Sequence, residues 1–148
     1  MAVTATPIFP QAPYSKSLSL AAATACTTRA PTATASLAGA NIVAFVPTST
    51  NGLRIDYLKI QACSNAIAAA TAANIVQIWL YDGTNAYLND EIVVTVVTPS
   101  AVLAAYNALY TYAVPLVLPP AFSLYASVTV TTTAATTALQ VTAYGGSY

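Results

Sequence analysis

Few side chains in this sequence could do chemistry, and their types and spacing limit what that chemistry could be. The chain of 148 residues has four basic residues, four acidic residues and no histidine. A Ser–His–Asp triad and a histidine-ligated metal centre are therefore excluded. Asp90 and Glu91 are adjacent, so on a strand their carboxylates point to opposite faces and cannot act as an acid–base pair.

The candidates for a metal or nucleophilic site are equally sparse. Asp82 could approach Asp90 and Glu91 around a turn, but Ca²⁺ takes about six to eight oxygen ligands and no carboxylate-rich loop is present. Cys26 and Cys63 cannot complete a tetrahedral zinc set in one chain, and neither has an imidazole base for nucleophilic catalysis. No glycine-rich phosphate loop occurs. We therefore predict a protein that is not an enzyme and has no metal or cofactor.

Two other groups of residues are candidates for contacts with a partner. Arg54 and Asp56 stand two residues apart, so on a strand they share a face, where they suit an ion pair or an interface contact. Tyrosine is enriched at interfaces because it buries a large ring while its hydroxyl stays hydrogen-bonded. Three of the ten tyrosines cluster in the sequence: Tyr106, Tyr110 and Tyr112. We expect them at an oligomer contact, and a sugar-binding aromatic platform is the alternative.

Successive β-strands are predicted to position these residues. Apolar and polar residues alternate, β-branched residues are common, and Gly, Pro, Asn and Asp separate the segments. The predicted strands are 17–27, 41–46, 53–62, 74–81, 87–97, 109–118, 122–132 and 137–144. This pattern predicts an all-β fold, an antiparallel β-sandwich that is jelly-roll-like.

Local signals refine this prediction. Asp-Gly at 82–83 predicts a tight turn between two strands. Thr-Pro at 98–99 predicts a short helix over 100–106, and the Ala-rich stretch 64–73 could form one or two helical turns. Pro115 indicates an edge or bulge position in its strand.

The domain organisation is predicted to be an extended N-terminal arm, residues 1–16, followed by a single β-sandwich domain, residues 17–148. Prolines recur every third residue in the arm, at Pro7, Pro10 and Pro13, and favour extended or polyproline-II backbone. The apolar anchors of the arm are Ile8, Phe9 and Tyr14. The arm either packs as a strand-like lead-in on its own domain or reaches onto a neighbour. The pair Gly145-Gly146 is expected to end the last strand.

The overall composition indicates a protein that contacts other protein. Charged residues make up 5% of the chain, hydrophobic ones 57%, and the net charge is zero. Four scattered cations cannot form the basic stripe of a nucleic-acid binder, and intrinsic disorder requires the reverse composition. No apolar run is long enough for a membrane-spanning helix. Since so few ionic groups give little protection against self-association, we infer a homo-oligomer or a partner; a neutral, Thr-coated monomer is the alternative.

The two cysteines are predicted to be buried and reduced, because small domains stapled by disulfides usually carry more of them. Lys16, the apolar stretch 17–25 and Cys26 loosely suggest a lipoprotein export segment. Against export, prolines precede Lys16 and the apolar run is short and Ala-rich. An exported surface adhesin domain is a further alternative function.

Four short segments stand out once the strands are placed: TPIFPQ at 6–11, NGLRID at 51–56, LYDGT at 80–84 and GGSY at 145–148. Together they resemble small virion proteins of tailed bacteriophages, of the kind that decorate or cement the capsid. The resemblance implies a structural protein with a jelly-roll-like fold that sits as a trimer on the capsid surface of the virion, after assembly in the host cytoplasm. It implies contact with the major capsid protein and bracing of the head. The alternative in this setting is a phage tail or fibre β-domain that binds host glycan through Tyr and Trp79.

Overall fold

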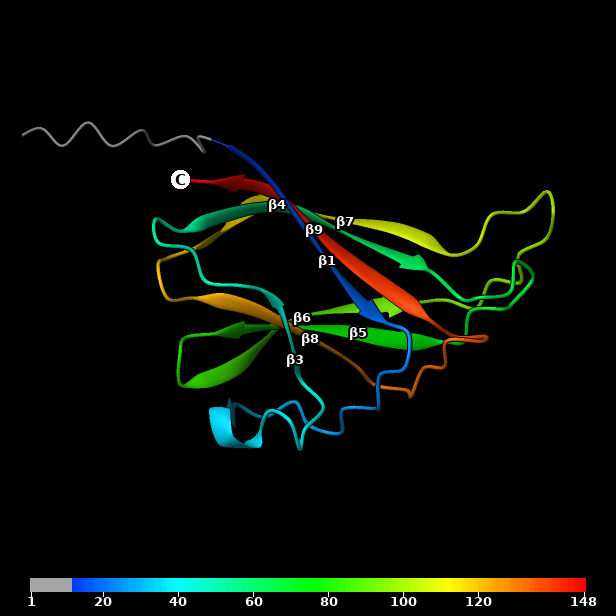
Figure 1. Cartoon of the computed structure of the whole chain (residues 1–148), viewed down its shortest axis with the longest axis horizontal. Coiled ribbons are helices and arrows are strands. Elements are labelled where there is room, and N and C mark those ends of the chain that lie inside the picture. The colour runs from blue at the N-terminus through cyan, green and yellow to red at the C-terminus, as the bar shows by residue number, and fades with distance from the viewer. Residues whose placement is uncertain (1–11) are drawn as a thin grey trace, which may run out of the picture.

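Two antiparallel sheets packed face to face make up the computed structural model, which describes residues 12–148 (Figure 1). Sheet A has the strand order β1-β9-β4-β7, and sheet B has the order β2-β6-β5-β8-β3. The strands are β1 (Ala12–Leu20), β2 (Thr32–Ala33), β3 (Val43–Val46), β4 (Leu53–Ala62), β5 (Asn74–Tyr81), β6 (Asn85–Val94), β7 (Asn107–Leu118), β8 (Ser123–Val128) and β9 (Leu139–Ser147), with one 3₁₀ turn η1 (Thr34–Ser36). The predicted all-β antiparallel sandwich is confirmed.

The pairing of the strands is nested in the manner of a jelly roll. Leaving aside the two-residue β2, β1 pairs with β9, β3 with β8, β4 with β7 and β5 with β6, all antiparallel. Such a chain is a long hairpin rolled into two layers. In the rolled form, β4 also pairs with β9 in sheet A, and β5 also pairs with β8 in sheet B. This is the double Greek-key order of eight-stranded jelly rolls.

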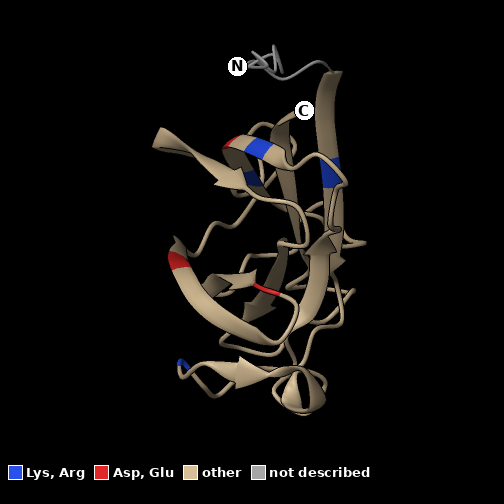
Figure 2. Ribbon diagram, turned by 90° about the vertical axis from the view of Figure 1, so that its left-hand side faces the viewer, with Lys and Arg blue, Asp and Glu red and all other residues tan. Residues whose placement is uncertain are grey.

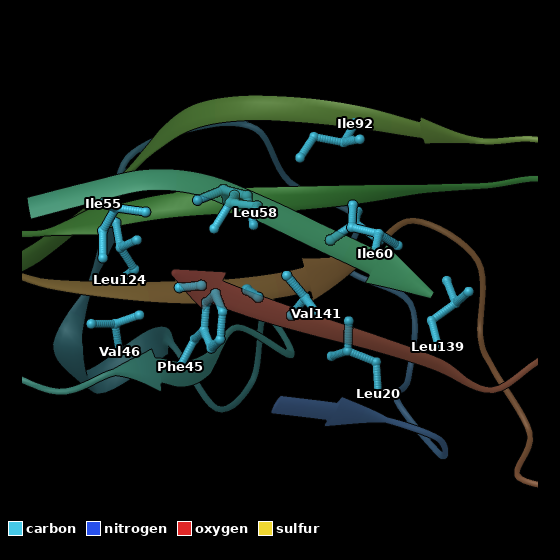
Figure 3. Close-up of a cluster of buried hydrophobic side chains, with 14 of the residues drawn as sticks. Leu20, Phe45, Val46, Ile55, Leu58, Ile60, Ile92, Leu124, Leu139 and Val141 are labelled. Carbon is cyan, nitrogen blue, oxygen red and sulfur yellow. The ribbon is translucent and has the colours of Figure 1, made fainter. Parts of the chain in front are cut away.

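The hydrophobic core lies between the two sheets and follows the predicted alternation. Ile55, Leu58 and Ile60 on β4 are fully buried, as are Leu124 on β8 and Val141 on β9 (Figure 3). Burying an aliphatic side chain of this size stabilises a fold by about 1.5–3 kcal/mol relative to leaving it in water. The core therefore fixes which face of each strand points inward.

A bulge in β4 changes this alternation next to the Arg54–Asp56 pair. Ile55 and Leu58 both face the core although they are three residues apart, because Asp56 has no partner in the register between β4 and β9. Opposite the bulge, residues 112–115 of β7 have no partners in β4. Pro115 thus lies at a register shift in an edge strand, as predicted.

The predicted end of the last strand is wrong. β9 runs through Gly145 and Gly146 to Ser147 and pairs with β1 on one side and β4 on the other. A Cβ atom on Gly145 would lie 1.7 Å from the Arg54 carbonyl oxygen. Glycine is present there because the bulged β4 backbone approaches β9 closely, and it does not terminate the strand.

The predicted helix over 100–106 is also wrong, and the Ala-rich stretch 64–73 forms no helix either. The hydroxyl of Ser100 accepts hydrogen bonds from the N–H groups of Val102 and Leu103, at 3.3 and 3.1 Å. The Ser100 N–H in turn donates to the Leu103 carbonyl oxygen at 3.0 Å. These bonds close a local turn, so the hydroxyl that could cap a helix stabilises a loop.

The turn predicted at Asp82-Gly83 is confirmed and joins β5 to β6. Gly83 has φ of +97°, which glycine adopts without strain. The Asp82 carboxylate accepts hydrogen bonds from the N–H groups of Thr84 and Asn85, both at 2.8 Å. These bonds, led by the one from Asn85, lower the pKa of Asp82.

The boundary between the arm and the domain differs from the prediction. β1 begins at Ala12, so residues 12–16 belong to sheet A, where they pair with β9, and β1 ends at Leu20. The rest of the predicted arm, which includes Ile8 and Phe9, lies outside the described residues. Leu18 and Leu20 contribute to the core, so the stretch compared above with an export segment is part of the folded sandwich.

Candidate contact surfaces

The three tyrosines predicted at an interface lie on or directly before the edge strand β7 of sheet A, and their hydroxyls form hydrogen bonds with β6 of sheet B. The hydroxyls of Tyr110 and Tyr112 donate to the two carboxylate oxygens of Asp90 on β6, at 2.8 and 3.0 Å. Their rings meet edge to face with centroids 5.3 Å apart. Tyr106, which is 9% exposed, donates to the Val93 carbonyl oxygen at 2.9 Å. These hydroxyls are therefore used within the chain, and a subunit contact through the three rings stays a prediction.

The same contacts change the acidity of these tyrosines. Burial raises the pKa of Tyr112 well above its ordinary value, and the negative charge of Asp90 raises it further. For Tyr110, the hydrogen bond to Asp90 is the main cause of a raised pKa, followed by burial. Burial also raises the pKa of Tyr106. All three side chains are thus held in the neutral form that donates.

Arg54 and Asp56 form the ion pair that their spacing predicts. The Arg54 Nε atom lies 2.7 Å from Asp56 Oδ1, and both side chains are 36% exposed. Ion pairs at such surface positions stabilise a fold by about 0–1 kcal/mol. The pair therefore shapes the surface beside the β4 bulge more than it stabilises the fold.

A shallow pocket opens beside this ion pair, and we call it the tyrosine pocket. Tyr57 on β4 and Tyr144 on β9 are opposite each other in the register, and their rings stack with centroids 4.8 Å apart and planes 20° apart. The pocket has a volume of about 350 Å³. Its lining comes from β1, β4 and β9: Pro13, Tyr14, Ser15, Asp56, Tyr57, Tyr144 and Gly145. No pattern in the sequence pointed to it, because the stack depends on the pairing of two strands far apart in the chain.

Trp79 cannot serve as a glycan platform, so this part of the alternative prediction is wrong. Its side chain is fully buried, and Nε1 donates to Ser127 Oγ at 2.8 Å. Ser127 donates to Gln77 at 2.9 Å, and Gln77 donates to Glu91 at 3.0 Å. Glu91 pairs with Arg29 at 2.8 Å, so a polar chain runs from Trp79 to the surface. The hydrogen bond from Gln77, more than the charge of Arg29, lowers the pKa of Glu91.

Trp79 is buried because the connection between β1 and β3 folds over the outer face of sheet B. A second core cluster forms there from Cys26, Leu37, Ile42, Trp79 and Ala86. Part of this connection, β2, adds to sheet B by pairing with β6. Strict alternation over 74–81 puts Trp79 on the face opposite Val76 and Ile78, but no signal in the small-residue stretch 28–39 indicated that this stretch would cover that face.

One end of the sandwich exposes large apolar side chains, which we call the apolar end patch: Ile67, Pro99, Val102 and Leu103. Val102 is 97% exposed, Ile67 is 86% exposed and Leu103 is 55% exposed. The patch lies where the β4–β5 and β6–β7 connections meet, at the end opposite the C-terminus (Figure 1). The sequence did not reveal it, because a helix over 100–106 would have buried some of these residues.

The few charges are divided between the sheets (Figure 2). Sheet A carries three cations and one anion, a net side-chain charge of +2: Lys16, Arg54, Lys59 and Asp56. Sheet B and its connections carry one cation and three anions, a net charge of −2: Arg29, Asp82, Asp90 and Glu91. The neutral chain therefore has a basic and an acidic side.

Both cysteines are free, but only Cys26 is buried as predicted, and Cys63 is half-buried. Burial raises the pKa of the Cys63 thiol. In the described part of the chain, no three His, Cys, Asp or Glu side chains are grouped so that they could hold a metal ion. No helix within residues 12–148 is both long and apolar enough to cross a membrane.

Comparison with known proteins gives little further information. No protein-family model matches this chain, and no curated protein sequence matches it. Among solved structures, it is similar to a chain in the structure of infectious bursal disease virus, Gx strain, with 10% sequence identity and a TM-score of 0.27. The match covers 99% of this chain and 40% of that one, so this chain spans about two fifths of the viral chain's length. The TM-score is too low for this likeness to indicate a shared fold.

Proposed function

We propose that this chain is a virion structural protein: a trimeric decoration, or cement, protein that binds the major capsid protein and stabilises the head of a tailed bacteriophage. The apolar end patch is the observation that carries the proposal. Val102 and Ile67 are almost completely exposed, although burying apolar surface is favourable by about 25 cal/mol per Å². A contiguous exposed patch of this kind is typical of a surface that another protein covers.

The edge of sheet A offers a second contact. β7 is twelve residues long, contains no charged residue and, within residues 12–148, pairs on one side only. Three of its aliphatic side chains are more than half exposed: Leu109, Val114 and Val117. Long apolar edges pair with other chains unless charges, prolines or bulges protect them, and here Pro115 with its register shift is the one such device on β7. We assign this edge to contacts between neighbouring subunits.

The distribution of charge suits a subunit that binds a lattice in one orientation. Because ionic groups are few, apposed surfaces desolvate few ions when they meet. The net charges of +2 on sheet A and −2 on sheet B favour one orientation over the reverse. Several modest contacts made at once, including one from residues 1–11, would together give high occupancy.

The jelly-roll order is found in viral capsid proteins and also in lectins, so the fold supports both a structural and a glycan-binding function. With Trp79 buried, a tail or fibre domain would have to bind glycan through half-buried tyrosines such as Tyr57 and Tyr144. We favour the structural function because the apolar end patch and the β7 edge suit protein partners better than sugars.

The test is to count copies in purified particles of the virus whose genome encodes the chain, and to measure how variants bind to capsids that lack it. We expect a copy number comparable to that of the major capsid protein. The double variant Ile67→Asp/Val102→Asp should lose capsid occupancy and keep its free energy of unfolding. Val130→Asp, at a 46% exposed valine outside the patch, is the matched control. A copy number typical of tail proteins, or full occupancy by the double variant, would contradict the proposal.

A further inference from the structure

We infer that the tyrosine pocket of one copy binds the proline-rich N-terminal segment of a second copy. This rests on the proposed function in one respect, namely that copies of the chain meet. The pocket is lined by two half-buried tyrosine rings, Tyr57 and Tyr144, which stack on each other on the outer side of sheet A. It lies beside the first described residues of β1, to which the N-terminal segment is covalently joined at Ala12.

The chemistry of the pocket suits a proline-rich ligand. Segments in polyproline-II conformation bind to aromatic-lined grooves, because proline rings pack flat against aromatic faces and the segment loses little conformational entropy. Here Pro13 already lines the pocket beside Tyr57 and Tyr144. Ser15 and Asp56 add polar groups at the rim. One proline of the chain thus already packs in the pocket wall, and the open volume of about 350 Å³ has room for a further proline ring.

The sequence of this chain provides a matching segment. Pro7 and Pro10 continue the three-residue spacing that ends at Pro13. A polyproline-II helix has about three residues per turn, so prolines at this spacing lie on one face. The eleven residues before Ala12 carry no charged side chain, which suits a pocket made largely of aromatic rings.

A second copy is a better source of this segment than the same copy. To enter its own pocket, the segment would have to reverse direction immediately before β1. Prolines at 10 and 13 push the residues before them, Phe9 and Ala12, toward extended backbone, which disfavours such a reversal. Extended at about 3.1 Å per residue, eleven residues span about 34 Å, enough to reach a neighbouring subunit.

The location of the pocket also makes the exchange reciprocal. In each copy, the N-terminal segment is joined to the chain beside the tyrosine pocket that accepts a neighbour's segment. Copies around a symmetry axis can therefore each insert a segment into one neighbour and bind the segment of another. A closed ring of three such exchanges leaves no pocket empty, so the arrangement fits the trimer proposed above.

The test uses the full-length chain with the photo-crosslinker p-benzoylphenylalanine in place of Phe9. Isotopically light and heavy protein are mixed in denaturant, refolded together so that the two kinds of subunit assemble at random, irradiated and analysed by mass spectrometry. We expect crosslinks to peptides that contain Tyr57 or Tyr144, in light–heavy pairs at the frequency of random mixing. Tyr57→Ser should lower the yield about tenfold, as for an aromatic hot spot, and so should Pro7→Ala/Pro10→Ala, which leaves residues 12–148 unchanged. Tyr87→Ser, at a 42% exposed tyrosine on β6, is the matched control.

Several results would overturn the inference. Crosslinks between peptides of one isotope only would place the segment in its own pocket. Crosslinks to other peptides, or no crosslinks in concentrated protein, would exclude the tyrosine pocket as the binding site of the segment. Binding of a glycan to the wild type but not to Tyr57→Ser would also contradict the inference. The copy number in virions does not depend on this crosslink, so the decoration function can stand where the segment exchange fails.

Discussion

Gly145 on β9 and Arg54 on β4 approach so closely that a Cβ atom on the glycine would lie 1.7 Å from the arginine's carbonyl oxygen. The atoms on both sides belong to the backbone of paired strands, so neither can move aside cheaply. We expect Gly145→Ala to lower the free energy of unfolding by about 3 kcal/mol or more, which places it among the most damaging single substitutions. Urea denaturation followed by Trp79 fluorescence measures this change.

Gly39→Ala is the control for this prediction. A Cβ atom there would be 3.7 Å from the Ser36 carbonyl oxygen, which is an ordinary contact. Its unfolding free energy should stay within about 0.5 kcal/mol of the wild type. Equal stability of Gly145→Ala and Gly39→Ala would show that β4 and β9 can separate at the bulge.

The buried polar chain behind Trp79 gives a second prediction. Ser127 accepts from Trp79 Nε1 and donates to Gln77 Oε1, and both partners are buried. Ser127→Ala leaves these two groups without a partner, which should lower the free energy of unfolding by about 2 kcal/mol. Since Trp79 is the single tryptophan, its emission should also change. Unchanged stability and emission would indicate that water replaces the lost hydroxyl.

Alkaline pH should weaken the fold through Tyr112. Because burial and Asp90 raise the pKa of Tyr112 in the folded chain, the unfolded chain loses this proton first as the pH rises. The stabilisation is therefore complete below the ordinary tyrosine pKa of about 10 and is lost above it. We expect the free energy of unfolding to fall less steeply above that pH in Tyr112→Phe than in the wild type.

Asp90→Asn provides an independent check on the alkaline prediction. It removes the negative charge that helps to raise the pKa of both Tyr110 and Tyr112, so its stability should also depend less on alkaline pH. Urea titrations at a series of pH values measure each slope. Identical slopes in the wild type and both variants would exclude these tyrosines as the origin of alkaline instability.

The sequence predicted the layers of the fold but not the places where a strand changes face. Strict alternation puts Val76 and Ile78 on the same face of β5, and both side chains lie in the core. The same alternation would put Leu88 and Ile92 on one face of β6, but Leu88 packs in the second cluster. The cause is a bulge at Asn89, since Ile78 pairs with Asp90 and Trp79 with Leu88. One inserted residue reverses every later side chain, and its local sequence gives little sign of it.

The contact surfaces were predicted less well than the fold, for a related reason. The spacing of Arg54 and Asp56 suited an ion pair or an interface contact, and the ion pair is observed because both residues lie on one strand. The Tyr57–Tyr144 stack and the apolar end patch each join segments far apart in the chain. Such surfaces depend on strand register and on loop conformation, and neither follows from a local pattern.

Two buried hydroxyl groups without a hydrogen-bond partner among the described residues provide a final prediction. They belong to Tyr14 on β1 and Thr71 in the β4–β5 connection. A buried, unpaired polar group costs about 1–3 kcal/mol, so Tyr14→Phe and Thr71→Val, which keep the shape of each side chain, should leave the free energy of unfolding equal or raise it. Thermal and urea unfolding of both variants measure this. A clear loss of stability in Tyr14→Phe alone would mean that the Tyr14 hydroxyl has a partner, with residues 1–11 or water as the source.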